Sequence, residues 1–413
     1  VAHALHMKID NELHFDRKNY FYSDLPKGYQ ITQNERPIGY DGYLDIVKDE
    51  GSRRINIERI HLEEDTCKQL HFADYTLVDY NRAGIPLAEI VSKPDIRSGI
   101  EAQKYVETIK SIVSFLNVSD GKMEEGSLRC DVNISLRPIG SEKFGKKVEI
   151  KNLNSTANIR FAIEYEIARQ TELLLKGEEV SQETRRWDEE NKCTFLMRKK
   201  TDAVDYKYFP EPNIPPIKLS DEFIANAINT MNELADSKQK RYLAAGLSEY
   251  DASLLIANRD ISSYFDESYK TCKNPKALAN WINVDVMAIL NRDEISIKDF
   301  FVSSSNLAKL VDLIEDKVIS NKQAREVFER MLRRNEDPND IVKSMGLSMI
   351  SDEGELLNII TEVLDNNAQS ISDYKNGKDR ALGYLLGQVM KVSKGKANPS
   401  MCSKLILKEI EKR

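Results

Sequence analysis

Apolar and polar positions follow two different rhythms along the chain. Residues 1–97 contain short runs in which the two kinds alternate, and within 54–65 the apolar residues Ile55 and Ile57 are separated by polar ones. That period of two is typical of a strand with one buried face. From Ser220 to the end, apolar residues recur at helical spacing instead. The pattern therefore predicts an α+β protein, with strands in the first half and helices in the second.

Amphipathic helices are expected inside the strand-rich half. In residues 98–116 apolar side chains recur at helical spacing, and Ser98 with Glu101 forms the pattern of a capping box. Residues 158–176 show the same spacing and stop at Gly177, a residue that commonly ends a helix. These segments interrupt the strands, which indicates a mixed arrangement of helices and sheet.

Two further alternating runs bring acidic residues onto one face. Residues 132–136 and 148–151 each alternate apolar with polar side chains, as half-buried strands do. If the two runs pair with their apolar faces together, Asp131 and Glu149 must lie on the same opposite face. Two carboxylates so placed repel each other unless a cation or a proton lies between them. They form either a cation site or a pair of solvated surface acids.

The loop between these runs nearly matches a phosphate-binding motif. Residues 140–147 read Gly-Ser-Glu-Lys-Phe-Gly-Lys-Lys, one position away from GxxxxGK[ST]. Lys147 stands where the motif needs a hydroxyl for Mg²⁺, and the loop leads into a strand although the motif must open a helix. We therefore interpret it as a hairpin loop and expect no nucleotide site of the P-loop type.

A polar turn between two apolar runs distinguishes residues 77–95. Gly84 permits a positive φ and Pro86 locks φ, so the backbone of the turn is tightly specified. A rigid, charged turn between buried flanks suits a site for a polar ligand, although an ordinary strand–turn–strand with a structural Asp–Arg pair has the same composition. The polar side chains concerned are Asp79, Asn81 and Arg82.

Two earlier segments also have more than one interpretation. Residues 15–22 mix aromatic rings with cations, so a ring could stack on a base while an ammonium group meets phosphate; an edge strand with solvated lysines explains them equally well. Residues 63–65 are three consecutive acids. They form either a solvated loop or a source of carboxylate oxygens for a hard cation such as Mg²⁺.

Composition places the chain among ordinary soluble proteins. It has 413 residues, 41% of them apolar and 31% charged, enough for two or three domains. The five cysteines contain no CxxC pair, so neither a zinc site nor a disulfide framework is indicated, and a reducing cytoplasmic compartment is expected. No run of about 18 apolar residues and no signal peptide are seen, so no membrane association is expected. The chain begins at Val1 rather than Met, as expected of a fragment.

Charge is distributed unevenly. The whole chain has a net charge of −7, which argues against a simple basic nucleic-acid binder. Residues 374–413, however, hold ten Lys and Arg against three acids, a net charge of +7. Residues 391–399 concentrate lysines on a flexible backbone, which suits contacts with a phosphate backbone. A basic module on an acidic protein predicts a phosphate-rich partner, whereas a solvated helix face is the plainer explanation.

The stretch 77–95 closely resembles the signature of the B subunits of aspartyl/glutamyl-tRNA(Asn/Gln) amidotransferases. Other blocks look like further parts of that family: 15–22, 63–65, 122–129, 149–155 and 205–210. Segments near the C-terminus are similar to its helical tail domain: 320–322, 373–378 and 387–391. The likeness runs over essentially the whole chain, and its motifs are very specific.

The resemblance implies three domains. A cradle of mixed and antiparallel sheet would carry the catalytic site in residues 1–217, and the proline cluster at 210–216 indicates a boundary there. An all-helical connector domain is expected at 218–296. A helical tail domain that binds tRNA is expected at 297–413.

The resemblance also implies a combined kinase and amidotransferase. The family uses ATP to phosphorylate the side-chain carboxylate of misacylated Glu-tRNA(Gln) or Asp-tRNA(Asn), and ammonia then displaces the phosphate. Phosphoryl transfer needs Mg²⁺ and cations around the developing charge more than a protein nucleophile. The expected partners are an amidase-type A subunit that makes ammonia from glutamine, a small C subunit, and the misacylated tRNA. The expected compartment is the bacterial cytoplasm or an organellar matrix.

The same family blocks imply the residues of each site. The carboxylates expected around Mg²⁺, with Glu63 close by, are Glu64, Asp131 and Glu149. Glu125 joins them in the catalytic set, and Arg82 is expected to hold the 79–81 turn in shape. ATP contacts are expected from Lys18, Tyr20, Tyr22, Ser127 and Arg129. Contacts with tRNA are expected from Lys375, Lys378, Lys391, Lys394 and Lys396. A zinc site is not expected, because the ligands are oxygens and no cysteine pair is available.

One departure concerns the start of the sequence. The family opens with a Glu-Val-His-Val element that contributes metal ligands, whereas residues 1–7 look like the later helix before the 15–22 block. His3 and His6 are not expected to replace those ligands, so the centre is expected to be incomplete unless a longer product supplies them. The alternative function is a non-catalytic tRNA-binding or assembly subunit, which would show no Mg²⁺-dependent ATP binding.

Overall fold

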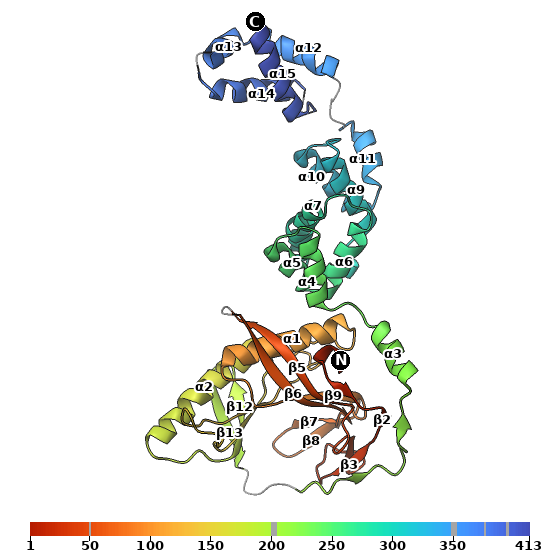
Figure 1. Cartoon of the computed structure of the whole chain (residues 1–413), viewed down its shortest axis with the longest axis vertical. Coiled ribbons are helices and arrows are strands. Elements are labelled where there is room, and N and C mark those ends of the chain that lie inside the picture. The colour runs from red at the N-terminus through yellow and green to blue at the C-terminus, as the bar shows by residue number, and fades with distance from the viewer. Residues whose placement is uncertain (49–50, 200–204, 348–352, 376, 394–395) are drawn as a thin grey trace. The chain divides into compact units, whose positions relative to one another are not determined.

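The chain forms two compact units, Val1–Ala235 and Asp236–Arg413. The computed structural model describes residues 1–48, 51–199, 205–347, 353–375, 377–393 and 396–413 (Figure 1). The first unit is built on sheets and the long helices α1 and α2, whereas the regular elements in the described part of the second unit are helices. The predicted α+β class is confirmed. None of the helices in these ranges combines the length and the apolar content needed to cross a membrane.

The first sheet is built around a long hairpin. Its antiparallel strand order is β1-β5-β6-β9, formed by β1 (Lys8–Ile9), β5 (Gly39–Lys48), β6 (Gly51–Glu64) and β9 (Pro86–Ser92). Along β6, Ile55 and Ile57 are fully buried and their polar neighbours are exposed. The strand predicted within 54–65 is therefore confirmed, and its alternation directs one row of side chains into the core.

Helices α1 (Gly99–Phe115) and α2 (Thr156–Leu175) are those predicted from helical spacing. Each follows a serine whose hydroxyl accepts a backbone N–H of the first turn, as Ser98 does at α1. The Glu101 carboxylate in the first turn of α1 accepts from the guanidinium of Arg53 at 2.6 Å. That ion pair ties the start of the helix to β6.

The second sheet has the order β10-β11-β12-β13: β10 (Val132–Ile134), β11 (Val148–Lys151), β12 (Glu183–Asp188) and β13 (Cys193–Lys199). The strands β11 and β12 run parallel and are connected through α2, while the other neighbours are antiparallel. Ile150 and Trp187 of this sheet belong to one buried apolar cluster with Ile159 and Ile163 of α2. The strands predicted at 132–136 and 148–151 are confirmed, the first ending at Ile134.

Short elements complete the first unit. Small antiparallel sheets have the orders β14-β3-β4, β15-β2 and β7-β8. Their strands are β2 (Glu12–Leu13), β3 (Asp16–Asn19), β4 (Tyr29–Thr32), β7 (Lys68–His71), β8 (Thr76–Asp79), β14 (Phe209–Pro210) and β15 (Ile217–Lys218). The unit also contains η1 (His3–Leu5) and α3 (Asp221–Asn229). Because β14 and β15 pair with β3 and β2, the proline-rich segment packs with the N-terminal strands.

Apolar residues of the second unit form one cluster from Tyr242 to Val342 and another from Leu356 to Ile410. The first is built by α4 (Ala235–Ala244), α5 (Glu249–Ile256), α6 (Arg259–Tyr269), α7 (Pro275–Asn280), η2 (Trp281–Val286), α8 (Met287–Asp293), η3 (Ile297–Asp299), α9 (Ser304–Glu315), α10 (Asn321–Met331) and α11 (Pro338–Met345). The second is built by α12 (Glu353–Asp365), α13 (Ala368–Lys375), α14 (Arg380–Val392) and α15 (Pro399–Lys412). The boundary expected at 296–297 falls inside the first cluster, and the three-domain division stays a prediction.

A buried ion network joins α2 to the second sheet. The Glu166 carboxylate is fully buried and accepts from Arg169, Gln170 and Thr194, and the Arg185 guanidinium lies 3.2 Å away. Burial alone would raise the pKa of Glu166, but these hydrogen bonds, led by that from Arg169, outweigh it and hold the pKa below its ordinary value. Glu183 of β12 also pairs with both Arg169 and Arg185, at 3.2 and 2.8 Å, so the network fixes the helix on the sheet through two acids and two arginines.

Replacing Glu166 by Gln is expected to destabilise the chain by about 1.5–3 kcal/mol, because Arg169 and Arg185 lose one charged hydrogen-bond partner while keeping their ion pairs with Glu183. The folded-state pKa of Glu166 is depressed, so its contribution is present above the unfolded-state pKa and disappears as the pH falls through the folded value. The difference in unfolding free energy between wild type and Glu166→Gln should therefore narrow below the ordinary glutamate pKa of 4.5.

Denaturant unfolding of both proteins between neutral and acidic pH measures this difference. The matched control is Glu164→Gln, because Glu164 lies on the same helix with its side chain 45% exposed. The control should change the unfolding free energy by less than about 0.5 kcal/mol. A difference for Glu166→Gln that stays constant with pH would contradict the assignment.

Candidate catalytic site

The open face of the second sheet gathers charged residues. In the β10–β11 register Asn133 pairs with Glu149, so Asp131 falls in line with Lys151, and these four side chains project from one face. The opposite face carries residues such as the fully buried Ile150. The face predicted to be shared by Asp131 and Glu149 is therefore confirmed.

A lysine lies between the two carboxylates. Lys151 Nζ donates to Asp131 Oδ2 at 2.7 Å and lies 3.3 Å from Glu149 Oε1. Thr184 of β12 donates to Glu149 Oε2 at 2.9 Å. Burial alone would lower the pKa of Lys151, but the bond to Asp131 and the charges of both acids outweigh it, so the pKa lies above its ordinary value. An internal ammonium group thus compensates the repulsion expected between the two acids.

Strands β12 and β13 extend this face with cations that sequence patterns did not single out. Their register places Arg186 beside Lys151 and Arg198 beside Thr184, which itself pairs with Glu149. Both arginines are exposed. Their position depends on the parallel pairing of β11 with β12 across α2, which no local pattern reveals. Carboxylates next to exposed cations can together hold a metal ion and a phosphate group.

The three consecutive acids at the end of β6 have different partners. Glu64 accepts from Lys27 Nζ at 2.6 Å and from the backbone N–H of Ile31 at 2.9 Å, and its side chain is 15% exposed. Asp65 is buried in a separate ion cluster, and Glu63 lines a cavity. Successive residues of an extended chain project to opposite sides, which explains the divergence. The run is therefore not a solvated acidic loop.

Asp65 links segments that are far apart in the sequence. Its Oδ2 accepts a hydrogen bond from Arg129 Nη2 at 2.8 Å and forms an ion pair with Arg82 Nη2 at 3.0 Å. Arg82 also donates to the carbonyl of Gly126 at 3.3 Å. The Asp65 side chain is 5% exposed, so water competes little for these bonds. The ion cluster holds the segment before β10 against the end of β6.

Arg82, which was expected to hold the 79–81 turn in shape, pairs with Asp65 and so anchors this segment to the end of β6. The turn is closed by its own side chains, because Asp79 Oδ1 accepts from the backbone and side-chain N–H groups of Asn81 at 2.9 and 2.7 Å. The structural Asp–Arg pair considered for this stretch exists, but it joins Arg82 to the buried Asp65. A buried carboxylate requires a cation, whereas the exposed Asp79 is solvated by water.

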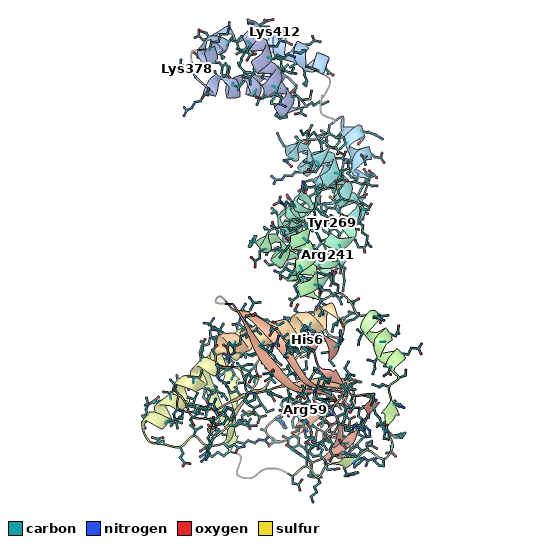
Figure 2. All side chains as sticks on the ribbon, viewed as in Figure 1. His6, Arg59, Arg241, Tyr269, Lys378 and Lys412 are labelled. Carbon is teal, nitrogen blue, oxygen red and sulfur yellow. The ribbon has the colours of Figure 1, made fainter. Side chains whose placement is uncertain are left out.

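A polar cavity of about 110 Å³ lies beside the first sheet. Its lining includes Lys18, Arg59, His61, Glu63 and Glu89; Figure 2 labels Arg59. His61 is nearly buried, with its Nε2 3.4 Å from Glu89 Oε2 and 4.0 Å from Glu63 Oε2. Burial and the nearby Glu89 raise the pKa of Glu63, whereas the hydrogen bond with His61 lowers the pKa of Glu89. Sequence patterns did not single out His61 or Glu89, because their proximity depends on the β6–β9 pairing.

The residues expected to contact ATP lie on different segments. Lys18 lines the cavity, and its Nζ lies 4.8 Å from the centroid of the Tyr206 ring and 5.6 Å from that of Tyr20. Burial raises the pKa of Tyr20, while Tyr22 is exposed. The other two residues expected to contact ATP, Ser127 and Arg129, lie in the segment before β10. In the same segment the expected catalytic residue Glu125 is exposed and accepts from Lys122 at 2.6 Å.

For a divalent cation the structure offers a convergent pair of carboxylates. Asp131 and Glu149 share one ammonium group, and carboxylate oxygens suit a hard cation such as Mg²⁺. The expected third ligand, Glu64, is instead bound to Lys27. Within the described ranges, a group of three possible metal ligands lies elsewhere, beside the first sheet. It consists of His61, Glu63 and Glu89, whose ligand atoms all lie within 4.8 Å of one another. The pair fits Mg²⁺, and the three-carboxylate set stays a prediction.

The tail helix α14 forms a second candidate surface. Gly383 and Gly387 lie one turn apart, and the space where each Cβ would be is open. Arg380 and Lys391 are exposed and fall on the same side of the helix by their spacing. Gly383 and Gly387 leave open space on this side of the helix beside the exposed ring of Tyr384, and the flanking cations suit phosphate groups.

The five lysines expected to contact tRNA differ in exposure. Lys375, Lys378 and Lys391 are exposed, and Lys396 is half-buried. Lys378, labelled in Figure 2, lies 3.0 Å from Asp373. Lys394 lies outside the described residues. Contact with tRNA stays a prediction for all five.

Comparison with known families accounts for both parts of the chain. Residues 1–225 match the GatB/GatE catalytic domain, and residues 263–410 match the GatB domain. The chain belongs to the GatB/GatE family. That family membership confirms the resemblance seen first in residues 77–95. The second sheet lies within the catalytic-domain match, and α14 lies within the GatB-domain match.

Curated relatives support the same family. Proteins named as the B subunit of aspartyl/glutamyl-tRNA(Asn/Gln) amidotransferase, from Lysinibacillus sphaericus (strain C3-41) and Bacillus cereus (strain AH187), are each 50% identical to the chain over 414 residues. Each alignment covers 100% of this chain and 87% of the relative. These names identify the members of the family as subunits of ligase-type amidotransferases.

The substitution Asp65→Asn should loosen the polar turn of residues 77–86, because Arg82 and Arg129 lose their shared carboxylate. Losing a charged hydrogen-bond partner at a buried site costs about 1.5–3 kcal/mol, so amide exchange in this segment should accelerate by about tenfold or more. Hydrogen-exchange mass spectrometry measures the effect. The control Asp45→Asn breaks an exposed pair with Arg54 and should leave the segment unchanged. Equal protection in Asp65→Asn and wild type would disprove the role of Asp65.

Proposed function

We propose that this chain acts as the B subunit in ATP-dependent transamidation of misacylated tRNA, converting Glu-tRNA(Gln), Asp-tRNA(Asn) or both to their amide forms. The names of relatives that are 50% identical over the whole chain support the substrate class. The structural observation that carries the proposal is the open face of the second sheet. There Asp131 and Glu149 converge beside the cations Lys151, Arg186 and Arg198.

The reaction explains why such a face is needed. A side-chain carboxylate is a poor electrophile, because it is anionic and lacks a leaving group. Transfer of the γ-phosphoryl group of ATP to a carboxylate oxygen makes an acyl phosphate, and attack by ammonia at the carbonyl carbon expels inorganic phosphate. Both steps develop charge on phosphate oxygens, so the site needs preorganised cations more than a protein nucleophile.

Each charged group of the face has a role in this scheme. Asp131 and Glu149 would hold Mg²⁺, which neutralises phosphate charge when bound. Thr184 keeps Glu149 in one orientation through its 2.9 Å hydrogen bond. Arg186 and Arg198 would bind phosphate oxygens, an interaction in which a guanidinium group can donate two parallel hydrogen bonds.

Further assignments rest on the family likeness. Glu64 is proposed as a third metal ligand and Glu125 as a further catalytic residue. ATP contacts are proposed for Lys18, Tyr20, Tyr22, Ser127 and Arg129. The bond between Asp65 and Arg129 supports this grouping, because it joins the residue after Glu64 to the segment that leads into Asp131.

Ammonia is proposed to come from an amidase-type A subunit that hydrolyses glutamine, with a small C subunit completing a heterotrimer. Apolar side chains exposed on and beside the β7–β8 hairpin support a protein partner, since a soluble surface rarely leaves such a group uncovered: Leu70, Phe72, Tyr75 and Leu77. The bacterial source of the relatives supports the bacterial cytoplasm over an organellar matrix as the compartment.

The tail is proposed to hold the tRNA backbone at its elbow, away from the reactive end. Residues 374–413 have a net charge of +7, and on α14 Gly383 and Gly387 leave open space between Arg380 and Lys391 beside the exposed Tyr384. The apolar cluster from Leu356 to Ile410 gives these helices a core of their own, so the two cations can stay on the surface. Contacts of this kind depend on phosphate charge and tolerate different sequences.

A non-catalytic tRNA-binding or assembly subunit is the second candidate function. One observation favours it: Lys151 already neutralises the repulsion between Asp131 and Glu149, so the two acids need no metal to coexist. Mg²⁺-dependent ATP binding separates the two functions, because a pure scaffold would show none.

Glu149→Gln keeps the side-chain shape and removes one charge. In the complete heterotrimer it is expected to lower tRNA-dependent ATP cleavage and amidation by about a hundredfold or more, the scale seen when a transition-state contact is removed. Folding and subunit assembly should be retained. The control Glu179→Gln changes an acid whose side chain is 83% exposed, and its activity should equal that of wild type.

A crystal soaked in Mn²⁺ completes this test. Metal density is expected with oxygens of Glu64, Asp131 and Glu149 at roughly 2–2.6 Å. Full activity of Glu149→Gln, or a metal more than about 4 Å from all three carboxylates, would remove these residues from the mechanism.

The tail prediction is best tested on its surface, because deleting 297–413 would cut through the apolar cluster from Tyr242 to Val342. The double substitution Arg380→Ala and Lys391→Ala should weaken tRNA binding and reduce the slope of log affinity against log salt by about 2. Ammonia production by the partner should be unaffected.

Fluorescence titration across a salt series measures both the affinity and the slope. The control double substitution is Lys273→Ala and Lys309→Ala, since both lysines are paired with acids in the first helical cluster. Unchanged affinity and slope in the tail variant would exclude α14 from the tRNA contact.

A further inference from the structure

The ammonium group of Lys151 lies between the carboxylates of Asp131 and Glu149. Its Nζ lies 2.7 Å from Asp131 Oδ2 and 3.3 Å from Glu149 Oε1. Asp131 immediately precedes β10, Glu149 lies on the antiparallel neighbour β11, and Lys151 is the last residue of β11. Lys151 therefore belongs to the same short strand as Glu149, one of the two acids that it contacts.

We propose that Lys151 is a tethered stand-in for the divalent cation: it bridges Asp131 and Glu149 in the metal-free state and must be displaced when the metal binds. This inference rests on the proposed function, in which these carboxylates hold Mg²⁺. It adds a property of the same site, namely that metal binding competes with an internal ammonium group.

Electrostatics makes the two cations exclusive. A divalent ion bound by both carboxylates would lie within a few ångströms of the present Nζ, a separation at which like charges repel even at a partly exposed site. The carboxylate oxygens that Lys151 now contacts are also those available to the metal. Glu149 Oε2 accepts from Thr184, and Oε1 is the oxygen that faces Lys151.

The surroundings determine where the displaced lysine goes. Arg186 is the neighbour of Lys151 on β12, so another cation borders it on that side of the sheet. The Lys151 side chain is 39% exposed and has a flexible four-carbon stem, so its ammonium can turn outward into solvent. Together with Arg186 it would then face an arriving phosphate group. Metal binding thus converts Lys151 from a counter-ion for the acids into a phosphate-binding cation.

Direct metal binding tests this exchange. The full chain, its Lys151→Met variant and its Glu149→Gln variant are titrated with Mn²⁺ alone and followed by electron paramagnetic resonance, which counts free Mn²⁺ without any activity. Lys151→Met should bind Mn²⁺ about tenfold or more tightly than wild type, because the competing charge is gone while both carboxylates remain. Lys151→Arg, which keeps a cation on the strand, should bind as weakly as wild type.

The experiment also needs a matched control variant and a check that each variant is folded. Lys146→Met removes a lysine paired with Glu179 near the surface and should bind Mn²⁺ like wild type. Thermal unfolding verifies that each variant is folded, and Lys151→Gln provides the same comparison should the Met variant be unstable. Equal or weaker Mn²⁺ binding by the folded Lys151→Met or Lys151→Gln protein would overturn the inference.

The outcomes also separate this inference from the proposed function. If wild type and Lys151→Met bind Mn²⁺ equally and Glu149→Gln binds less, the metal site stands and the stand-in role falls. If none of the variants binds Mn²⁺, both the metal site on this chain and the role of Lys151 are refuted.

Discussion

Compensation of carboxylate charge by cations from distant segments is the constraint on which the first unit depends. The carboxylate of Asp65 is buried, and its charge is tolerated there because Arg82 and Arg129 contact it. These arginines lie 17 and 64 residues further along the chain. Glu166 is fully buried on α2 and is matched by Arg185 on β12. Removing a buried charge from water is costly unless a partner is held in place. Each pair therefore fixes one particular arrangement of helix, strand and turn.

The same constraint shapes the candidate site. The apolar face of the second sheet packs on α2. The polar face therefore carries Glu149 and Lys151 of β11 together with Asp131, which immediately precedes β10. Arg186 and Arg198 join them from β12 and β13. Because α2 packs against the opposite face of the sheet, these charged side chains are already ordered. They therefore lose little conformational entropy when a ligand binds. Rigid positioning matters because phosphoryl transfer depends on placing charge more than on a protein nucleophile.

The sequence alone was enough for features with a local physical cause. Alternation predicted β6, β10 and β11, helical spacing and serine caps predicted α1 and α2, and strand parity placed Asp131 and Glu149 on one face. Specific motifs also pointed to the GatB/GatE family before any fold was known. These results need only the periodicity of the backbone or residues adjacent in the chain.

Only the tertiary structure decided which partners the charged residues take. It assigned Arg82 to Asp65, put Lys151 between two acids, and brought His61 and Glu89 to one cavity. It also showed that the first helical cluster continues across residue 296. Such contacts join strands and helices separated by tens of residues, and many pairings satisfy the same local pattern. The selection among them comes from burial and charge compensation over the whole unit, which a local pattern cannot express.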